Sequence, residues 1–311
     1  MSTTAFFGAI ELGLLLGLVA IAVFVSFRIL DFPDLTVEGS FPLGAAVAAV
    51  LVVNLKVDPF TATAVAVTAG AAAGTFTGLL HTRLQIIPIL AGILMMTALY
   101  SVNLRIMGRP NVALLGEGTV FTSAASALGL AERPAVLITL MMATLASCAL
   151  LAIFLLSRFG LALRAAGANS RMARANGVDD GQMIVVGLAI SNGFAALAGA
   201  LFAQAHGAAD ATMGFGIIVI GLASLIVGEG LLPSRRIVVM IAACLLGSLL
   251  YRLAVSLALN TDWLGLKSQD LSLVTAVMVA AAVVVGRARR QRQEAIASRV
   301  ATGIANEHKR V

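Results

Sequence analysis

Residues 160–182 read GLALRAAGANSRMARANGVDDGQ, the longest polar interval between the apolar blocks of the chain. One apolar run stops before it at Leu156, and another begins after it at Met183. The interval is rich in Ala and Met, which favours a short amphipathic helix. Residues 158–182, which we call the basic loop, carry Arg158, Arg164, Arg171 and Arg174. A basic, partly helical loop between two membrane spans would suit the docking of a cytoplasmic partner protein.

The composition around this loop is that of an integral membrane protein. Of the 311 residues, 60% are hydrophobic and 12% are charged, and the mean hydropathy is +1.01. A soluble domain carries about 25% charged residues. Apolar runs of roughly 20 residues recur along nearly the whole length and leave no room for a soluble domain. We therefore expect an all-α, polytopic fold, with one transmembrane domain at 1–286 and a basic tail at 287–311.

The apolar runs predict about nine membrane spans, and the basic residues predict their orientation. The spans are expected near 6–29, 43–55, 61–80, 86–107, 134–156, 183–204, 214–227, 237–259 and 271–285, with a polar loop at 108–133. When the spans alternate, fifteen of the 21 Lys and Arg residues lie on the side of the basic loop and the tail, and six lie opposite. The positive-inside rule then makes that side cytoplasmic and places the N-terminus outside. This distribution of charge accounts for the net charge of +6 without a nucleic-acid partner.

Two short spans are preceded by polar breaks. Residues 31–40 read DFPDLTVEGS, and their proline and glycine, together with Pro42 just after them, predict an interrupted helix. The acids Asp34 and Glu38 would either line a solute pathway or cap an ordinary polar turn. Glu229, between two glycines at the end of the seventh span, has the same two interpretations, and Asn103 could face the pathway. The spans at 6–55 and 183–227 resemble the two halves of an inverted repeat, an arrangement common in transporters.

Other sequence features indicate packing rather than chemistry. The glycines at positions 70, 74 and 78 follow helical spacing, which favours close helix contact over a pore wall. The segment at 265–268 lacks the spacing of a phosphate-binding loop, and the three histidines are isolated. Neither a metal-ligand cluster nor a catalytic Ser/His/Asp order stands out, and both cysteines lie in apolar runs. We therefore expect no catalytic residue, metal or bound cofactor in this chain.

Two stretches resemble a known family. The pattern Gly-x-x-x-Arg-Ala-x-Gly-x-Asn at 160–169, followed by Ala173 and Asn-Gly-Val at 176–178, resembles the cytoplasmic loop of bacterial ABC importer permeases. The match is to the branched-chain amino acid and ribose permease superfamily, and 190–201 resembles a helix of that family. The segment DLTVEGS at 34–40 resembles DLSVGS of the sugar permeases. The longer stretch DLTVEGSFPLGAAVAA, together with GLASLIVGE at 221–229, resembles a subgroup associated with tryptophan and tyrosine import.

The resemblance implies one permease subunit of an importer with two permeases and two ATPases in the bacterial inner membrane. ATP and Mg²⁺ would bind the cytoplasmic ATPase, a periplasmic or lipid-anchored protein would deliver the solute, and the second permease would be an identical copy. The basic loop would form the ATPase-coupling helix, with contacts at Arg164, Ala165, Gly167, Asn169, Ala173, Asn176, Gly177 and Val178. The translocation path and gate would involve Asp34, Thr36, Glu38, Gly39, Ser40, Asn103 and Glu229, while Gly70, Gly74 and Gly78 would serve helix packing.

Two other classes of membrane protein also fit the sequence. In an ion-coupled secondary transporter, the acids Glu38 and Glu229 would be the ion sites, whereas a channel or a structural subunit would need no binding protein. Aromatic residues make up only 5% of the chain and give no obvious cage for an aromatic solute. An aromatic amino acid is therefore an expectation from the family alone, ahead of other amino acids, purines and sugars.

Overall fold

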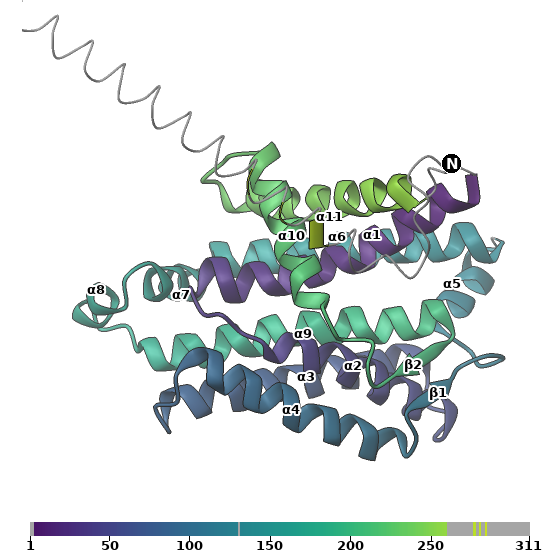
Figure 1. The fold of residues 1–311 in the computed structure, drawn as a ribbon, viewed down its shortest axis with the longest axis horizontal. Helices are drawn as coiled ribbons and strands as arrows, with labels where there is room; N and C mark the ends of the chain where they lie inside the picture. The colour runs from purple at the N-terminus through teal and green to yellow at the C-terminus, as the bar shows by residue number, and fades with distance from the viewer. Residues whose placement is uncertain (1–2, 130, 260–275, 278–279, 281–283, 285–311) are drawn as a thin grey trace, which may run out of the picture.

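A computed structural model describes residues 3–129, 131–259, 276–277, 280 and 284 as a bundle of long, roughly antiparallel helices (Figure 1). Within these ranges, seven helical stretches are long and apolar enough to cross a membrane, as the polytopic all-α prediction requires. The long helices are α1 (Thr3–Val23) with its π-helical continuation η1 (Phe24–Ile29), α2 (Thr36–Val53), α3 (Pro59–Thr82), α4 (Pro88–Met107), α6 (Glu132–Leu156), α9 (Asp180–His206) and α11 (Ile237–Leu259). A shorter apolar helix, α10, spans Ile217–Leu231.

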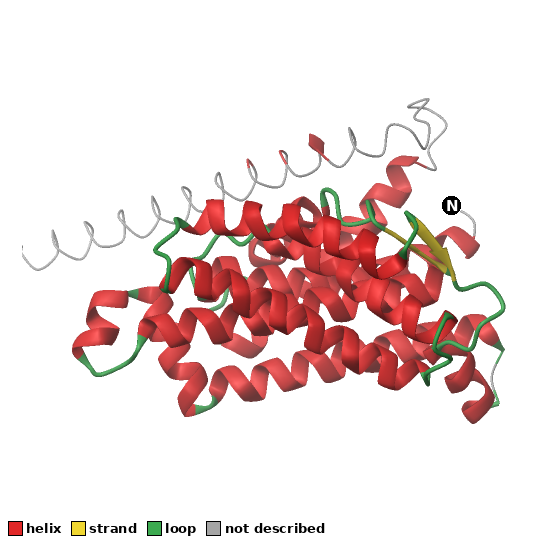
Figure 2. Cartoon of the chain, turned by 90° about the horizontal axis from the view of Figure 1, so that it is seen from below, coloured by secondary structure: helices red, strands yellow, loops and turns green. Residues whose placement is uncertain are grey.

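The short elements gather at the two ends of the bundle. At one end, which we call the loop end, lie α7 (Arg158–Ala168) and α8 (Ser170–Ala175). At the other, the strand end, β1 (Asn111–Ala113) pairs antiparallel with β2 (Ala208–Asp210) near α5 (Val120–Leu128). Figure 2 shows the two strands together at one end of an otherwise helical chain.

Small residues let helix backbones meet at the centre of the bundle, where α9 packs against α2 and α3. A side chain on Gly44 of α2 would overlap the backbone of Ala196, and one on Gly199 of α9 would overlap the backbone of Phe41. Such close approach brings many atoms into van der Waals contact, the main source of helix association where water is absent. The same packing fixes the position of the polar groups that α2 and α9 carry.

Two helices begin inside the bundle rather than at its ends. After η1 reaches the loop end, residues 30–35 turn back without helical structure, and α2 starts at Thr36 and runs to the strand end. After β2, residues 211–216 turn back from the strand end, and α10 starts at Ile217 and runs to the loop end. The two half-helices therefore run in opposite directions from the interior, as an inverted pair does.

The predicted boundaries of both half-helices were wrong. The second span begins at Thr36 instead of residue 43, so Pro42 lies inside the helix. Within a helix a proline removes the hydrogen bond to the carbonyl four residues earlier, here that of Glu38, and α2 continues past it. The seventh span continues past residue 227 to Leu231, because Gly228 packs against the backbone of Ala243 instead of ending the helix.

The loops hold more structure than the sequence predicted. Residues 108–133, expected to be a polar loop, contain β1 and α5. The basic loop forms two helices instead of one, separated at Asn169, whose side chain accepts a hydrogen bond from the backbone of Met172. The ninth predicted span and the basic tail lie almost entirely outside the described residues.

Candidate functional site

The two half-helices meet through one carboxylate. Glu38, in the first turn of α2, accepts a hydrogen bond from the backbone N–H of Gly216 at 3.1 Å. Gly216 has a φ of +77°, a conformation that glycine adopts easily, and it immediately precedes α10. Glu38 of α2 therefore caps the N-terminus of α10, where the helix dipole favours negative charge.

Pro42 and Gly214 bring the loop at 211–216 close to α2. Because Pro42 has no N–H, the Glu38 carbonyl lacks its intrahelical donor. The backbone of Gly214 lies against that carbonyl, and a Cβ on Gly214 would overlap it. The proline and the glycine together create the gap in which the loop lies.

A second acid, Asp34, is completely buried in a hydrogen-bond network. Its carboxylate accepts the backbone N–H of Thr36 at 2.9 Å and the Asn192 side-chain amide at 2.6 Å. Ser40 donates to the Asn192 side-chain oxygen at 2.7 Å, and the Thr36 and Thr77 hydroxyls lie 2.8 Å apart. This network ties the start of α2 to α3 and α9, and its members have no exposed surface.

Asn103 of α4 is also completely buried, but its hydrogen bonding is incomplete. Its side-chain N–H donates to the carbonyl of Gly39 at 3.2 Å, which fixes the orientation of the amide. Its side-chain oxygen, Oδ1, has no partner within the described part of the chain. An unsatisfied buried acceptor is costly, so such an atom commonly marks a place where a ligand or water binds.

A cavity of about 190 Å³ lies beside these groups, between α2, α4 and the loop at 211–216. Glu38 and Asn103 supply acceptors, and Tyr100 and Phe215 supply aromatic rings that are 41% and 64% exposed. The walls are completed by Gly39, Pro42, Met96, Thr97, Ala211 and Gly214. We call this space the Glu38 cavity, and it combines an acid and an unpaired acceptor with apolar walls.

The structure distributes the predicted pathway residues over three places. Glu38, Gly39 and Asn103 line the Glu38 cavity, whereas Asp34, Thr36 and Ser40 belong to the buried network. Glu229 lies at the loop end, where it forms a 2.8 Å ion pair with Arg28. This ion pair joins the end of α10 to the end of η1.

The predicted coupling residues lie on α7, on α8 and in the turns that follow these two helices. Gly167 packs against the carbonyl of Ile29 so closely that a Cβ would overlap it, and Ala173 is buried. Arg164 and Val178 are half-buried, while Ala165, Asn169, Asn176 and Gly177 are exposed. Leu161 and Met172 are 59% and 65% exposed, so this end presents apolar as well as polar surface.

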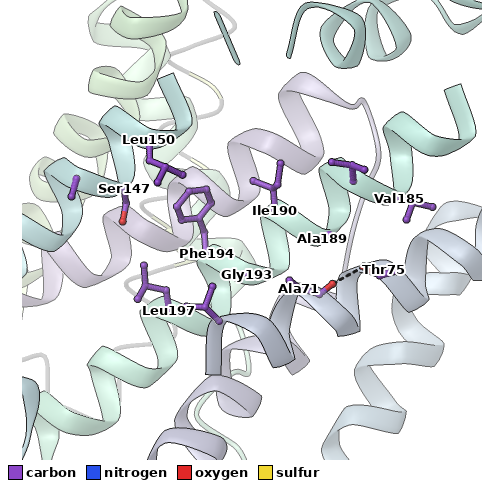
Figure 3. Close-up of a pocket in the computed structure, with 13 residues that line it drawn as sticks. Ala71, Thr75, Ser147, Leu150, Val185, Ala189, Ile190, Gly193, Phe194 and Leu197 are labelled. Carbon is purple, nitrogen blue, oxygen red and sulfur yellow. Dashed lines mark hydrogen bonds between the residues drawn. The ribbon is translucent and has the colours of Figure 1, made fainter. Parts of the chain in front are cut away.

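A larger groove of about 520 Å³ lies between α3, α6 and α9. Figure 3 shows Leu150, Phe194 and Leu197 among its apolar side chains. Its two hydroxyl side chains, Thr75 and Ser147, donate to carbonyls of their own helices. No charged residue lines the groove, so it lacks the groups that would orient a polar solute.

The aromatic walls of the Glu38 cavity were missed in the sequence because they come from separate elements. Tyr100 lies in α4, and Phe215 lies in a loop far along the chain. The glycines of α3 lie against α9: Gly70 beside Asn192, Gly74 beside Leu188 and Gly78 beside Val185. Among the residues that the structure describes, no group of His, Cys, Asp and Glu is arranged to hold a metal.

Comparisons with known proteins agree on a family. Residues 5–286 match the family described as branched-chain amino acid transport system, permease component. A tyrosine transport system permease protein of Clostridioides difficile is 37% identical over 274 residues, covering 88% of each chain. An uncharacterised protein of Rickettsia prowazekii is 32% identical over 275 residues, covering 87% of this chain and 94% of that protein. No solved structure matches the chain.

Proposed function

Because the chain belongs to the family of permease components of branched-chain amino acid transport systems, we propose that it imports an amino acid by alternating access. In this proposal the solute is an aromatic amino acid, delivered by a binding protein and released into the cytoplasm. The energy comes from a separate ATPase, which binds the ATP and Mg²⁺.

The main support for this proposal is the contact between the two half-helices. Helices α2 and α10 start in the interior, and Glu38 joins them by its hydrogen bond to Gly216. Discontinuous helices that meet near the membrane midplane are a common basis of transport sites. A joint of few polar contacts can have two arrangements, and a partner that stabilises one arrangement shifts the population.

The loop end supports coupling to an ATPase. Gly167 of α7 lies against Ile29, the last residue of η1, and the chain continues from there directly into the break before α2. A displacement of α7 would therefore act on the segment that leads to Glu38. The exposed surface of α7 and α8 remains available to the ATPase, and the excess of basic residues on this side supports a cytoplasmic position for it.

The relative named for tyrosine transport supports the choice of solute. In this proposal a second copy of the chain packs against the exposed apolar side of α4, which includes Leu94 and Tyr100. In a pair, the two Glu38 cavities would open toward the shared interface, and the binding protein would dock at the strand end.

The proposal is tested by reconstituting the chain with its ATPase and binding protein in liposomes. We expect tyrosine uptake that requires ATP and stops with vanadate. Uptake that follows an ion gradient without ATP would instead establish a secondary transporter.

The coupling assignment is tested by Ala165→Glu, which changes an exposed residue of α7. We expect co-purification of the ATPase to weaken by about 10-fold or more, since a buried charge opposes docking. The control is Leu115→Glu, at an 85% exposed position near the strand end, which should leave ATPase binding unchanged. Equal ATPase binding by both variants would contradict the assignment.

A further inference from the structure

We propose that the Glu38 cavity is a recognition site of the permease itself for the primary ammonium and the aromatic ring of the solute. Glu38 and the Asn103 side-chain oxygen would accept the ammonium hydrogens, and Tyr100 and Phe215 would contact the ring. This assignment rests on the proposed function and adds to it that the permease, as well as its binding protein, selects the solute.

The polar groups of the cavity are complementary to a cation that donates hydrogen bonds. Glu38 accepts hydrogen bonds from the backbone N–H groups of Gly216 and Ile218, whereas a carboxylate can accept about four hydrogen bonds. Asn103 Oδ1 is buried without a partner in the described part of the chain. None of the lining residues is Lys, Arg or His, so the cavity contains no cation for the acid. An ammonium group brings three donors and the missing positive charge.

The apolar walls are complementary to a flat ring. Tyr100 is 41% exposed and Phe215 is 64% exposed, so neither ring is part of the packed core. Met96 lines the same cavity, and methionine sulfur makes favourable contacts with aromatic rings. Phe215 lies between Gly214, which packs against the Glu38 carbonyl, and Gly216, which has a φ of +77°. The cavity is smaller than the roughly 300–1,000 Å³ of drug-sized sites, as suits a solute of amino-acid size.

The same features oppose other solutes. A sugar offers no positive charge to Glu38, and a phosphate would be repelled by it. The start of α10, which would otherwise attract an anion, is already capped by Glu38. The solute's own carboxylate is therefore expected to point toward the cavity mouth, away from the acid.

Equilibrium binding of tritiated tyrosine to the permease–ATPase complex in nanodiscs, without the binding protein, tests this assignment. Tyramine keeps the ammonium and lacks the carboxylate, whereas 3-(4-hydroxyphenyl)propionate keeps the carboxylate and lacks the ammonium. We expect tyramine to displace tyrosine and the propionate, at equal concentration, to leave it bound. Leucine should compete less well than phenylalanine, because it lacks the ring.

Variants assign the effects to residues. Glu38→Gln should weaken tyrosine binding by about 10-fold or more, the value of a charge-assisted hydrogen bond. Tyr100→Ala and Phe215→Ala should each weaken it by about 2- to 10-fold, as loss of a ring contact does. The matched controls are Glu117→Gln and Phe76→Ala, an acid near the strand end and an exposed ring on α3. Both controls should bind tyrosine as the unchanged chain does.

The outcomes separate this assignment from the proposed function. If the unchanged complex shows no ATP-driven amino acid uptake, the proposed function fails. If it imports tyrosine but shows no tyrosine binding in nanodiscs, or if the propionate displaces tyrosine as well as tyramine does, the recognition site alone is overturned. The recognition site is also overturned if Glu38→Gln and Phe215→Ala bind and import tyrosine as the controls do. Should Glu38→Gln fail to fold, the analogue competition and the two ring variants still decide.

Discussion

The two breaks that precede α2 and α10 occupy equivalent places in the two halves, yet they are built differently. The break at 30–35 ends in a sealed network, where Asp34 and Asn192 have no exposed surface. The break at 211–216 is open, and its Phe215 is 64% exposed beside a cavity. At the first break, the side-chain hydrogen-bond partners come from α3 and α9, whereas Glu38 of α2 caps the helix that follows the second break.

The break in an interrupted helix can therefore serve either as a fixed support or as part of a binding site. The network of Asp34 satisfies the buried polar groups at the start of α2, which is what a rigid element requires. The start of α10 is capped by the carboxylate of Glu38, a residue that also lines the cavity. We therefore expect stability to depend mainly on the first break and transport mainly on the second.

The largest effect on stability is expected from Asn192→Leu. This change removes the amide that donates to Asp34 and accepts from Ser40, and leaves a buried carboxylate with one partner fewer. We expect a loss of about 3 kcal/mol in the free energy of unfolding, measured by denaturation in mixed micelles. The control is Ser191→Ala, which removes one hydrogen bond to the carbonyl of Ala22 from the next buried position. Equal stability of the two variants would contradict a sealed network.

A direct comparison of the two acids should give the next largest difference. Asp34→Asn loses one of two acceptor oxygens in a fully buried place, and we expect a cost of about 2 kcal/mol. In Glu38→Gln the amide oxygen can still accept the N–H of Gly216, so the expected cost is below about 1 kcal/mol. The same denaturation experiment checks both. A larger cost for Glu38→Gln would reverse the roles of the two breaks.

Gly214→Ala should separate the loop at 211–216 from α2. The added methyl group would overlap the carbonyl of Glu38, and we expect a cost of about 1.5 kcal/mol together with reduced tyrosine uptake. The control is Gly118→Ala, where a Cβ would meet nothing within 4 Å. If Gly214→Ala imports tyrosine like the control, the close approach of loop and helix has no part in transport.

The smallest effect concerns the residue that precedes the open break. The hydroxyl and backbone N–H of Thr212 hold the pKa of Asp210 below its usual range. A lowered pKa in the folded state gives stability above the ordinary pKa, and this stability is lost as the pH falls through the lowered value. Asp210→Asn should therefore be less stable than the unchanged chain at pH 7, with a difference that shrinks below pH 4. Parallel curves of thermal stability against pH would contradict this.

Hydropathy predicted much of the fold, because the length of an apolar span is a local property of the sequence. The span at 237–259, for example, was predicted at the bounds that α11 has. The role of each acid could not be predicted, because it depends on partners far away in the chain. Glu229 and Glu38 had similar surroundings in the sequence, but Arg28 pairs with the first and Gly216 with the second. The sequence predicts a helix break at Pro42, which lies inside α2, because nothing local shows that its missing N–H makes room for Gly214.

In the proposed transporter, the open break forms part of the transport path and the sealed break does not. Thiol labelling of Phe215→Cys and Ser40→Cys, each in a chain with Cys148 and Cys244 replaced by Ala, distinguishes the two breaks. In liposomes containing the whole transporter, a membrane-impermeant maleimide should label Phe215→Cys from one face, and trapping with ATP and vanadate should abolish that labelling. Ser40→Cys should stay unlabelled throughout, because Ser40 is completely buried. Equal labelling of both positions, or labelling of Phe215→Cys that ATP and vanadate leave unchanged, would contradict the claim.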